Sequence, residues 1–263
     1  MNISIATIGN EVVKGRTLDT NFTEISKFFT EAGENVIYHV SCRDIQSEID
    51  TALTFLMKNS DVIITTGGLG PTMDDITINS IAKSLKVNLS YNQEYFKKLE
   101  ASYKKRGLEF TEERKKMSLL PIGSETITNN VGSAPGMFLR FNEKIIISLP
   151  GVPAEMRSML PIIGEKLNLG EKHYISREYR IIGIMESSLA PVAKEISRKL
   201  KNDIYIKSHP VSFENNLPIL ILEVYGYGPD ETELKARVDK TVQELAKLVK
   251  TIFKKDILNS GEL

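Results

Sequence analysis

The sequence has a single cysteine, no excess of charge and no long apolar run, and each of these absences excludes a class of protein. Cys42 alone cannot form an intrachain disulfide or a CxxC motif, which favours a reducing, cytoplasmic setting and an inert thiol. Lys and Arg number 34, as do Asp and Glu, so nothing suggests attraction to nucleic acid or to an acidic membrane. No apolar run approaches the roughly 18–20 residues that span a bilayer, and the N-terminus lacks the basic segment of a signal peptide.

The first part of the chain alternates strands and helices. Apolar runs and spacing predict strands at 3–8, 36–40 and 62–66, helices at 19–32, 44–57 and 76–85, a charged helical stretch at 92–120, a hairpin of strands 137–141 and 144–149, and a helix at 153–167. Repeated strand–helix units imply an α/β fold with a mostly parallel sheet and helices on both faces. We expect this first domain to cover residues 1–169.

The pattern changes from about residue 170. Strands at 179–184, 203–208 and 217–227 and helices at 187–200 and 230–253 predict a small α+β domain covering residues 170–255. The last residues, 256–263, are expected to be a disordered tail.

The most informative segment runs from Thr65 to Thr77 and reads TTGGLGPTMDDIT. Glycines let backbone N–H groups approach an anion, a following helix adds positive potential, and carboxylates hold a hard cation, so the segment predicts a site for phosphate and metal. It matches neither common nucleotide fingerprint. Gly70 is followed by Pro71 rather than by the Lys of a P-loop, and Met73 stands where a dinucleotide loop needs its third glycine.

Carboxylates on three loops are expected to converge on this segment. Ligands of doubly wound sheets bind beyond the carboxyl ends of the strands, so the loops carrying Glu11, Asp44 and Asp74-Asp75 should face one crevice. Each feature also has a purely structural alternative. Asp75 can end a capping box begun at Thr72, Asp44 can be the N-cap of a helix, Glu11 can be a solvated turn residue, and the glycines can be turn or packing positions.

In combination, several segments resemble the MoaB/Mog-type molybdopterin-binding domain, and most closely its CinA branch. They are TTGGLGPTMDDIT at 65–77, IGNEVVKG at 8–15, DTN at 19–21, KMSLLP at 116–121, NVGSAPG at 130–136, LPGVPAEM at 149–156, GIMES at 183–187 and KSHP at 207–210. The resemblance covers nearly the whole chain. It implies a three-layer α/β/α domain with strand order 2-1-3-5-4, the fifth strand antiparallel, followed by the small domain.

The same resemblance implies an activity. Asp75 and Asp44 match acidic positions that serve magnesium-dependent adenylyl transfer to molybdopterin in Mog-like relatives. The CinA branch implies hydrolysis of a nucleotide diphosphate such as ADP-ribose to AMP and ribose 5-phosphate, with a divalent metal and potassium. Three departures are Asn10 at a position that is often acidic, Met73 at one that is often polar, and NVGS at 130–133. The C-terminal deamidase domain of long forms has no counterpart, so nicotinamide-mononucleotide deamidation is not expected.

Our leading interpretation is therefore a metal-dependent nucleotide pyrophosphatase. The groups expected to hold the phosphates are Gly67, Gly68, Gly70, Thr72, Ser133 and Gly136. Asp75, assisted by Asp44 and Glu11, is expected to bind Mg²⁺ or another divalent ion, and Asp74 to orient a water. The alternatives are a molybdopterin-binding protein or adenylyltransferase of molybdenum-cofactor assembly, and a non-catalytic binding module, which Asn10 keeps open. The expected partners are a nucleotide or pterin and, from the resemblance, other copies of the chain in a dimer or trimer.

Overall fold

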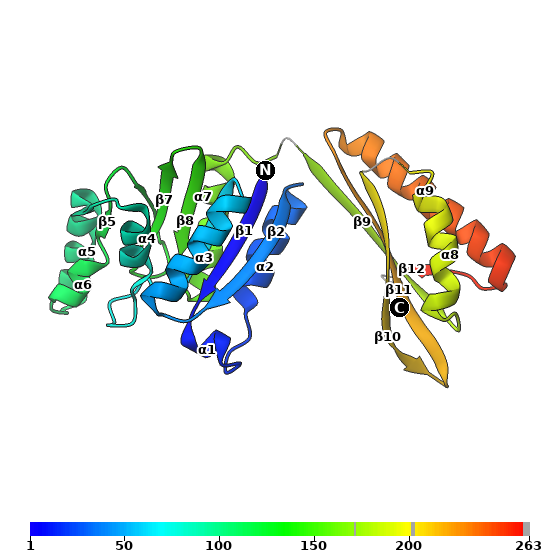
Figure 1. Cartoon of the computed structure of the whole chain (residues 1–263), viewed down its shortest axis with the longest axis horizontal. Helices are drawn as coiled ribbons and strands as arrows, with labels where there is room; N and C mark the ends of the chain where they lie inside the picture. Colours follow the sequence, from blue (N-terminus) through cyan, green and yellow to red (C-terminus); the bar gives the residue numbers. More distant parts are fainter. Residues whose placement is uncertain (171, 201–202, 260–263) are drawn as a thin grey trace. The chain divides into compact units, whose positions relative to one another are not determined.

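The computed structural model describes residues 1–170, 172–200 and 203–259. The chain divides into two compact units, each described by itself below (Figure 1). The first contains residues 1–30 and 34–169, and the second contains residues 31–33 together with the chain from Gly170 onward.

A six-stranded sheet forms the centre of the first unit. Its order is β2 (Asn35–Cys42), β1 (Asn2–Ile8), β3 (Val62–Thr66), β8 (Lys144–Leu149), β7 (Gly136–Phe141) and β6 (Glu125–Ile127). The α/β class and the order 2-1-3-5-4 are confirmed by the first five of these strands. The antiparallel strand, however, is β7, the fourth of the five predicted strands along the chain, whereas β8, the fifth, runs parallel to β3. Sequence reasoning also missed β6, a short strand that pairs with β7.

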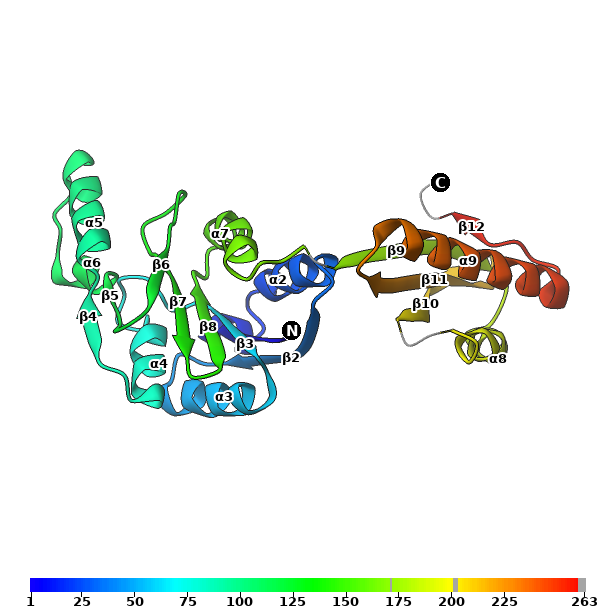
Figure 2. The same cartoon turned by 90° about the horizontal axis from the view of Figure 1, so that it is seen from above.

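Helices cover both faces of this sheet (Figure 2). On one face, α2 (Thr20–Glu31) and α7 (Pro153–Lys166) bury Phe29 and Met156 against β1, β3 and β8. On the other, α3 (Gln46–Asn59) and α4 (Thr77–Leu85) bury Leu56 and Ile81 against the side chains of alternate strand residues such as Ile63. Successive strand residues point to opposite faces, so the apolar runs 62–64 and 145–147 require this double cover.

The charged stretch 92–120 is not one helix. It forms α5 (Gln93–Lys105) and α6 (Glu112–Lys116), separated by Gly107 with φ +66, and it is flanked by a two-stranded ladder of β4 (Leu89–Tyr91) and β5 (Leu119–Pro121). A glycine in the left-handed region ends a helix without strain. The break turns α6 back, so that Tyr103 and Met117 share one buried cluster.

The second unit is a four-stranded sheet with two helices. The sheet order is β10 (Ile204–Glu214), β11 (Leu217–Gly228), β9 (His173–Ile182) and β12 (Leu258–Asn259), and α8 (Glu186–Ser197) and α9 (Glu231–Phe253) share its core. The expected tail is wrong for Leu258 and Asn259, which pair with Arg180 and Tyr179 because the edge of β9 offers unpaired backbone groups. The rest of that tail, 260–263, lies outside the described residues. No helix in the described ranges is long and apolar enough to cross a membrane.

Cys42 ends β2 and is 7 % exposed. Burial, followed by the charges of Glu48 and Asp44, raises the pKa of the thiol to about 11. At pH 8 only about a thousandth of the thiol is then ionised, and the thiolate is the reactive form. We expect the native protein to react slowly with a thiol reagent such as DTNB and the urea-unfolded protein to react at once with one equivalent. Equal rates in the two states would show that the end of β2 opens readily.

Candidate functional site

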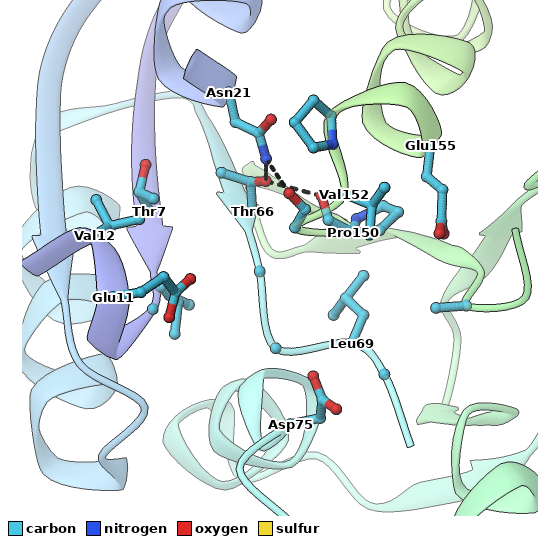
Figure 3. A pocket seen from close by; sticks show the side chains of 18 of the residues that line it. Thr7, Glu11, Val12, Asn21, Thr66, Leu69, Asp75, Pro150, Val152 and Glu155 are labelled. Atoms are coloured by element: carbon cyan, nitrogen blue, oxygen red, sulfur yellow. Dashed lines mark hydrogen bonds between the residues drawn. The ribbon is translucent and has the colours of Figure 1, made fainter. Parts of the chain in front are cut away.

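The loops at the carboxyl ends of the parallel strands enclose a cavity of about 560 Å³ (Figure 3). It is lined by the loops that follow β1, β2, β3 and β8 and by the segment between β6 and β7. Of the residues expected at the site, those that line it are Glu11, Asp44, Gly67, Gly68, Gly70, Asp74, Asp75 and Ser133. Thr72 and Gly136 lie outside it. Gly136 begins β7, where a Cβ would meet Met159, Ile127 and Ser148 at about 3 Å.

The glycine loop leaves β3 with two residues at positive φ, Gly67 at +105 and Gly68 at +66. A Cβ on Gly67 would lie 2.0 Å from the carbonyl oxygen of Ile8, so only glycine allows the loop to pass the end of β1. The N–H of Gly67 donates to the carbonyl of Leu149 over 3.0 Å. It is therefore not available to a phosphate, which corrects the expectation for that residue. The N–H groups of Gly68 and Gly70 have no acceptor within the described part of the chain.

Asp44 joins the loops that follow β1 and β2. Its Oδ2 accepts a hydrogen bond of 2.9 Å from the backbone N–H of Asn10. The N-cap alternative is wrong, because α3 begins at Gln46 after Ile45 and receives no side-chain cap. Burial raises the pKa of Asp44, the Asn10 N–H opposes the shift, and the negative charges of Glu11 and Asp74 add to it. Asp44 is therefore a partly buried carboxylate close to two others.

Asp74 and Asp75 are tied to Thr72 in their own loop. Asp75 Oδ2 accepts from the Thr72 N–H at 2.8 Å and from its hydroxyl at 2.5 Å, and a Cβ on Gly70 would lie 2.6 Å from the same oxygen. Asp75 does not cap α4, which begins at Thr77 after Ile76, but it does brace the loop locally. The single Thr72 hydroxyl proton is shared between Asp75 and Asp74, and this hydrogen bond lowers the pKa of Asp74, which is exposed. Thr72 thus organises the loop instead of lining the cavity.

No three His, Cys, Asp or Glu residues in the described ranges are grouped closely enough to hold a metal ion by themselves. The cavity lining is nevertheless strongly acidic. It contains the six carboxylates Glu11, Asp19, Asp44, Asp74, Asp75 and Glu155, and no Lys, Arg or His among the described residues. A phosphate-bearing ligand would meet only like charge there, so its negative charge needs a cation that comes with it.

Comparison with known proteins places the chain in a family. Residues 4–168 match the family model of a probable molybdopterin binding domain. The chain belongs to this family. A crystal structure of the protein CinA with unknown function from Thermoplasma acidophilum is 36% identical, with a TM-score of 0.60 over 63% of this chain and 97% of that one. This confirms the expected resemblance to CinA.

Two further relatives of this family member match nearly their whole length, including the second unit. A protein of Caldivirga maquilingensis is 40% identical over 252 residues, which is 96% of this chain and 98% of that protein. A protein of Saccharolobus solfataricus is 39% identical over 251 residues, which is 94% of this chain and 92% of that protein. The sequence similarity therefore extends over both units of this chain.

Sequence reasoning singled out DTN and LPGVPAEM as motifs but assigned no role to their polar residues. Asn21 donates to Thr66 Oγ1 at 2.8 Å and to the Gly151 carbonyl at 2.9 Å, and the Thr66 hydroxyl donates to the Pro150 carbonyl at 3.0 Å (Figure 3). This network ties α2 and β3 to the loop before α7. Glu155, in the first turn of α7, is the other missed residue, and it reaches the cavity from the far wall.

Lys116 was also named only as part of a motif. In the structure it holds the loop 72–76, which carries Asp74 and Asp75, in place. Its Nζ donates to the carbonyls of Thr72 at 2.6 Å and Asp75 at 3.1 Å. We expect Lys116→Met to speed amide hydrogen exchange of loop 72–76 by about tenfold, as loss of about 1.4 kcal/mol of local stability implies. Lys115→Met is the matched control, because Lys115 pairs instead with Glu112 of its own helix. Equal exchange in the two variants would show that the loop is held by other contacts.

Proposed function

We propose that the first unit binds a nucleotide diphosphate together with a divalent cation such as Mg²⁺ and hydrolyses it, with ADP-ribose as the model substrate and AMP and ribose 5-phosphate as products. The observation that carries this proposal is one cavity at the ends of the parallel strands whose described lining combines free loop amides with carboxylates and includes no basic side chain. Together with the CinA resemblance, this favours cation-assisted chemistry on a phosphate.

The donors fit such an ion. Asp44 has its pKa raised by burial and by the charges of Glu11 and Asp74, so three carboxylates lie close enough there to act on one another. Mg²⁺ is usually held by one or two carboxylates, with substrate phosphates and waters completing its shell. A preformed set of three protein ligands is therefore not required. Asp44 and Asp75, with Glu11 beside them, are the residues that would hold the ion.

Each protein group then has its own role. The N–H groups of Gly68 and Gly70, with Ser133 opposite, bind the phosphate oxygens, and Asp74 accepts a hydrogen bond from the attacking water and orients it. The metal ion, when bound, lowers the pKa of a water and offsets negative charge on the phosphates. The water oxygen forms a new bond to phosphorus while the bridging P–O bond breaks. The two protons of the water end on the products or on buffer.

A second candidate is supported by the family match to a molybdopterin binding domain. The same amides and carboxylates would bind a pterin phosphate and an adenylyl donor, and the protein would then bind or adenylylate molybdopterin. This candidate differs from the first in its acceptor, which is a pterin phosphate instead of water.

The test is incubation of the purified protein with ADP-ribose, with and without Mg²⁺ and with and without K⁺, followed by chromatography of the products. We expect AMP and ribose 5-phosphate only when the divalent ion is present. If folded protein forms no AMP under any ion, hydrolysis is excluded, and saturable binding of molybdopterin would then favour the second candidate. Absence of divalent-ion binding by calorimetry would favour a non-catalytic binding module.

A further inference from the structure

The cavity has two chemically different ends. Asp44, Glu11 and Asp74 line the cavity on the loops that follow β2, β1 and β3, and the charges of Glu11 and Asp74 act on Asp44. Glu155 is set apart from them, on the opposite side of the glycine loop from Glu11 (Figure 3). The carboxylate of Glu155 therefore lies apart from the proposed phosphate and cation end.

One wall of the cavity near Glu155 is apolar. Leu69, Tyr103, Met117 and Ala134 line the cavity and belong to one buried cluster, none of them more than 8 % exposed. Tyr95 of the same cluster has its pKa raised by burial and, secondly, by the charge of Glu155, which places the carboxylate beside this cluster. An apolar wall with one carboxylate suits a ring or a sugar better than a phosphate.

The Glu155 carboxylate is held in place on one side only. Its Oε2 accepts a hydrogen bond of 2.5 Å from Asn129 Nδ2. Asn129 also donates to the carbonyl of Ala134 and accepts from the N–H groups of Val131 and Gly132 in the same loop. Gly132 leaves room for the carboxylate, because a Cβ there would lie 2.2–2.4 Å from its atoms. No other group of the described chain donates to the carboxylate of Glu155. A carboxylate offers about four lone-pair sites, so at least two remain for a ligand.

We propose that Glu155 is a specificity-determining residue that accepts two hydrogen bonds from a pair of adjacent donors on the non-phosphate part of the ligand. Two ligand groups have this chemistry: the cis-diol of a ribose, and the N–H and NH₂ edge of a 2-amino-4-oxo-pyrimidine ring such as guanine or a pterin. The pairing edge of adenine, with one donor and one acceptor, does not fit a carboxylate. This inference rests on the proposed binding of a phosphate-bearing ligand in the same cavity.

The test compares ligand pairs in wild type, Glu155→Gln and Glu165→Gln. Gln keeps an oxygen for Asn129 but loses the acceptor pair, and Glu165 is the matched control on the same helix outside the cavity. Calorimetry with Ca²⁺ in place of Mg²⁺ measures affinity. ADP-ribose against 2′-deoxy-ADP-ribose and ADP tests the sugars, and GDP against IDP tests the base edge.

We expect wild type and Glu165→Gln to bind one ligand that carries the donor pair about tenfold or more tightly than the analogue that lacks a donor. Glu155→Gln should lose most of that preference. The pair that responds identifies the source of the donors. If Glu155→Gln weakens all ligands equally, Glu155 only anchors the loop and the inference is wrong, while hydrolysis can still stand. If wild type binds ADP-ribose but forms no AMP with Mg²⁺, the hydrolase proposal fails and the preference ratio still tests Glu155. If wild type binds no probe, both fail.

Discussion

Asp44→Asn lowers the divalent-ion-dependent rate of AMP formation from ADP-ribose by about a hundredfold or more, because even residues that only orient metal ligands are worth 10–100-fold. The variant keeps an oxygen for the Asn10 N–H, so the link between the loops after β1 and β2 persists. The measurement is the initial rate as a function of Mg²⁺ concentration. Asp50→Asn, on the exposed side of α3, is the control and keeps the wild-type rate.

The stability of the same variant moves in the opposite direction. The folded-state pKa of Asp44 is raised, chiefly by burial, so folding favours the protonated form and the ionised form costs stability once the pH exceeds that pKa. Near neutral pH, Asp44→Asn should therefore melt at the same temperature as wild type or above it. In wild type, protons should also compete with the cation at a higher pH than they do for an ordinary aspartate. A lower melting temperature together with an unchanged rate would show that Asp44 is structural and remove it from the mechanism.

Asp75→Asn is expected to affect both the rate and the loop structure, whereas Asp44→Asn is expected to affect mainly the rate. Asp75 Oδ2 accepts two hydrogen bonds from Thr72 while the carboxylate also borders the cavity, so its loss disturbs the loop as well as any bound ion. We expect the rate to fall sharply and amide exchange of loop 72–76 to rise together. This double effect reflects a residue whose structural and site roles overlap.

The sequence was sufficient for the parts of the site that depend on topology. An apolar strand followed by TTGGLGPTMDDIT places its loop at the carboxyl end of the sheet, and the loops carrying Glu11 and Asp44 follow because parallel strands share that end. The order of the five strands was predicted from the family resemblance.

The features of the site that could not be predicted from the sequence depend on contacts between distant segments. The N–H of Gly67 is taken by Leu149 because β8 lies beside β3, and nothing local to Gly67 indicates this. The position of Glu155 depends on Asn129 closing the loop before β7, a contact 26 residues away in sequence. The pairing of β12 with β9 likewise depends on where the chain returns after α9. Periodicity within a segment carries no information about such contacts.

Gly67→Ala is expected to be among the most destabilising single substitutions in the first unit. Its φ of +105 disfavours any Cβ, and the added atom would lie 2.0 Å from the Ile8 carbonyl oxygen, which is backbone at the end of β1 and cannot rotate away. Strain from the backbone and overpacking together suggest a loss on the order of 2–5 kcal/mol. In a unit of this size that corresponds to a fall in melting temperature of about 5–15 °C.

Gly15→Ala separates the two causes. Gly15 also has positive φ, +67, but a Cβ there would have no neighbour within 4 Å, so only the backbone penalty of about 1–2 kcal/mol applies. Both substitutions lie in the first unit, so differential scanning calorimetry should show the same transition shifted by different amounts, much further for Gly67→Ala. Equal shifts would mean that β1 and the glycine loop move apart to admit a methyl group. The close approach of Gly67 to the Ile8 carbonyl would then be readily relieved by small shifts of the backbone. Gly67 would be required for its φ alone.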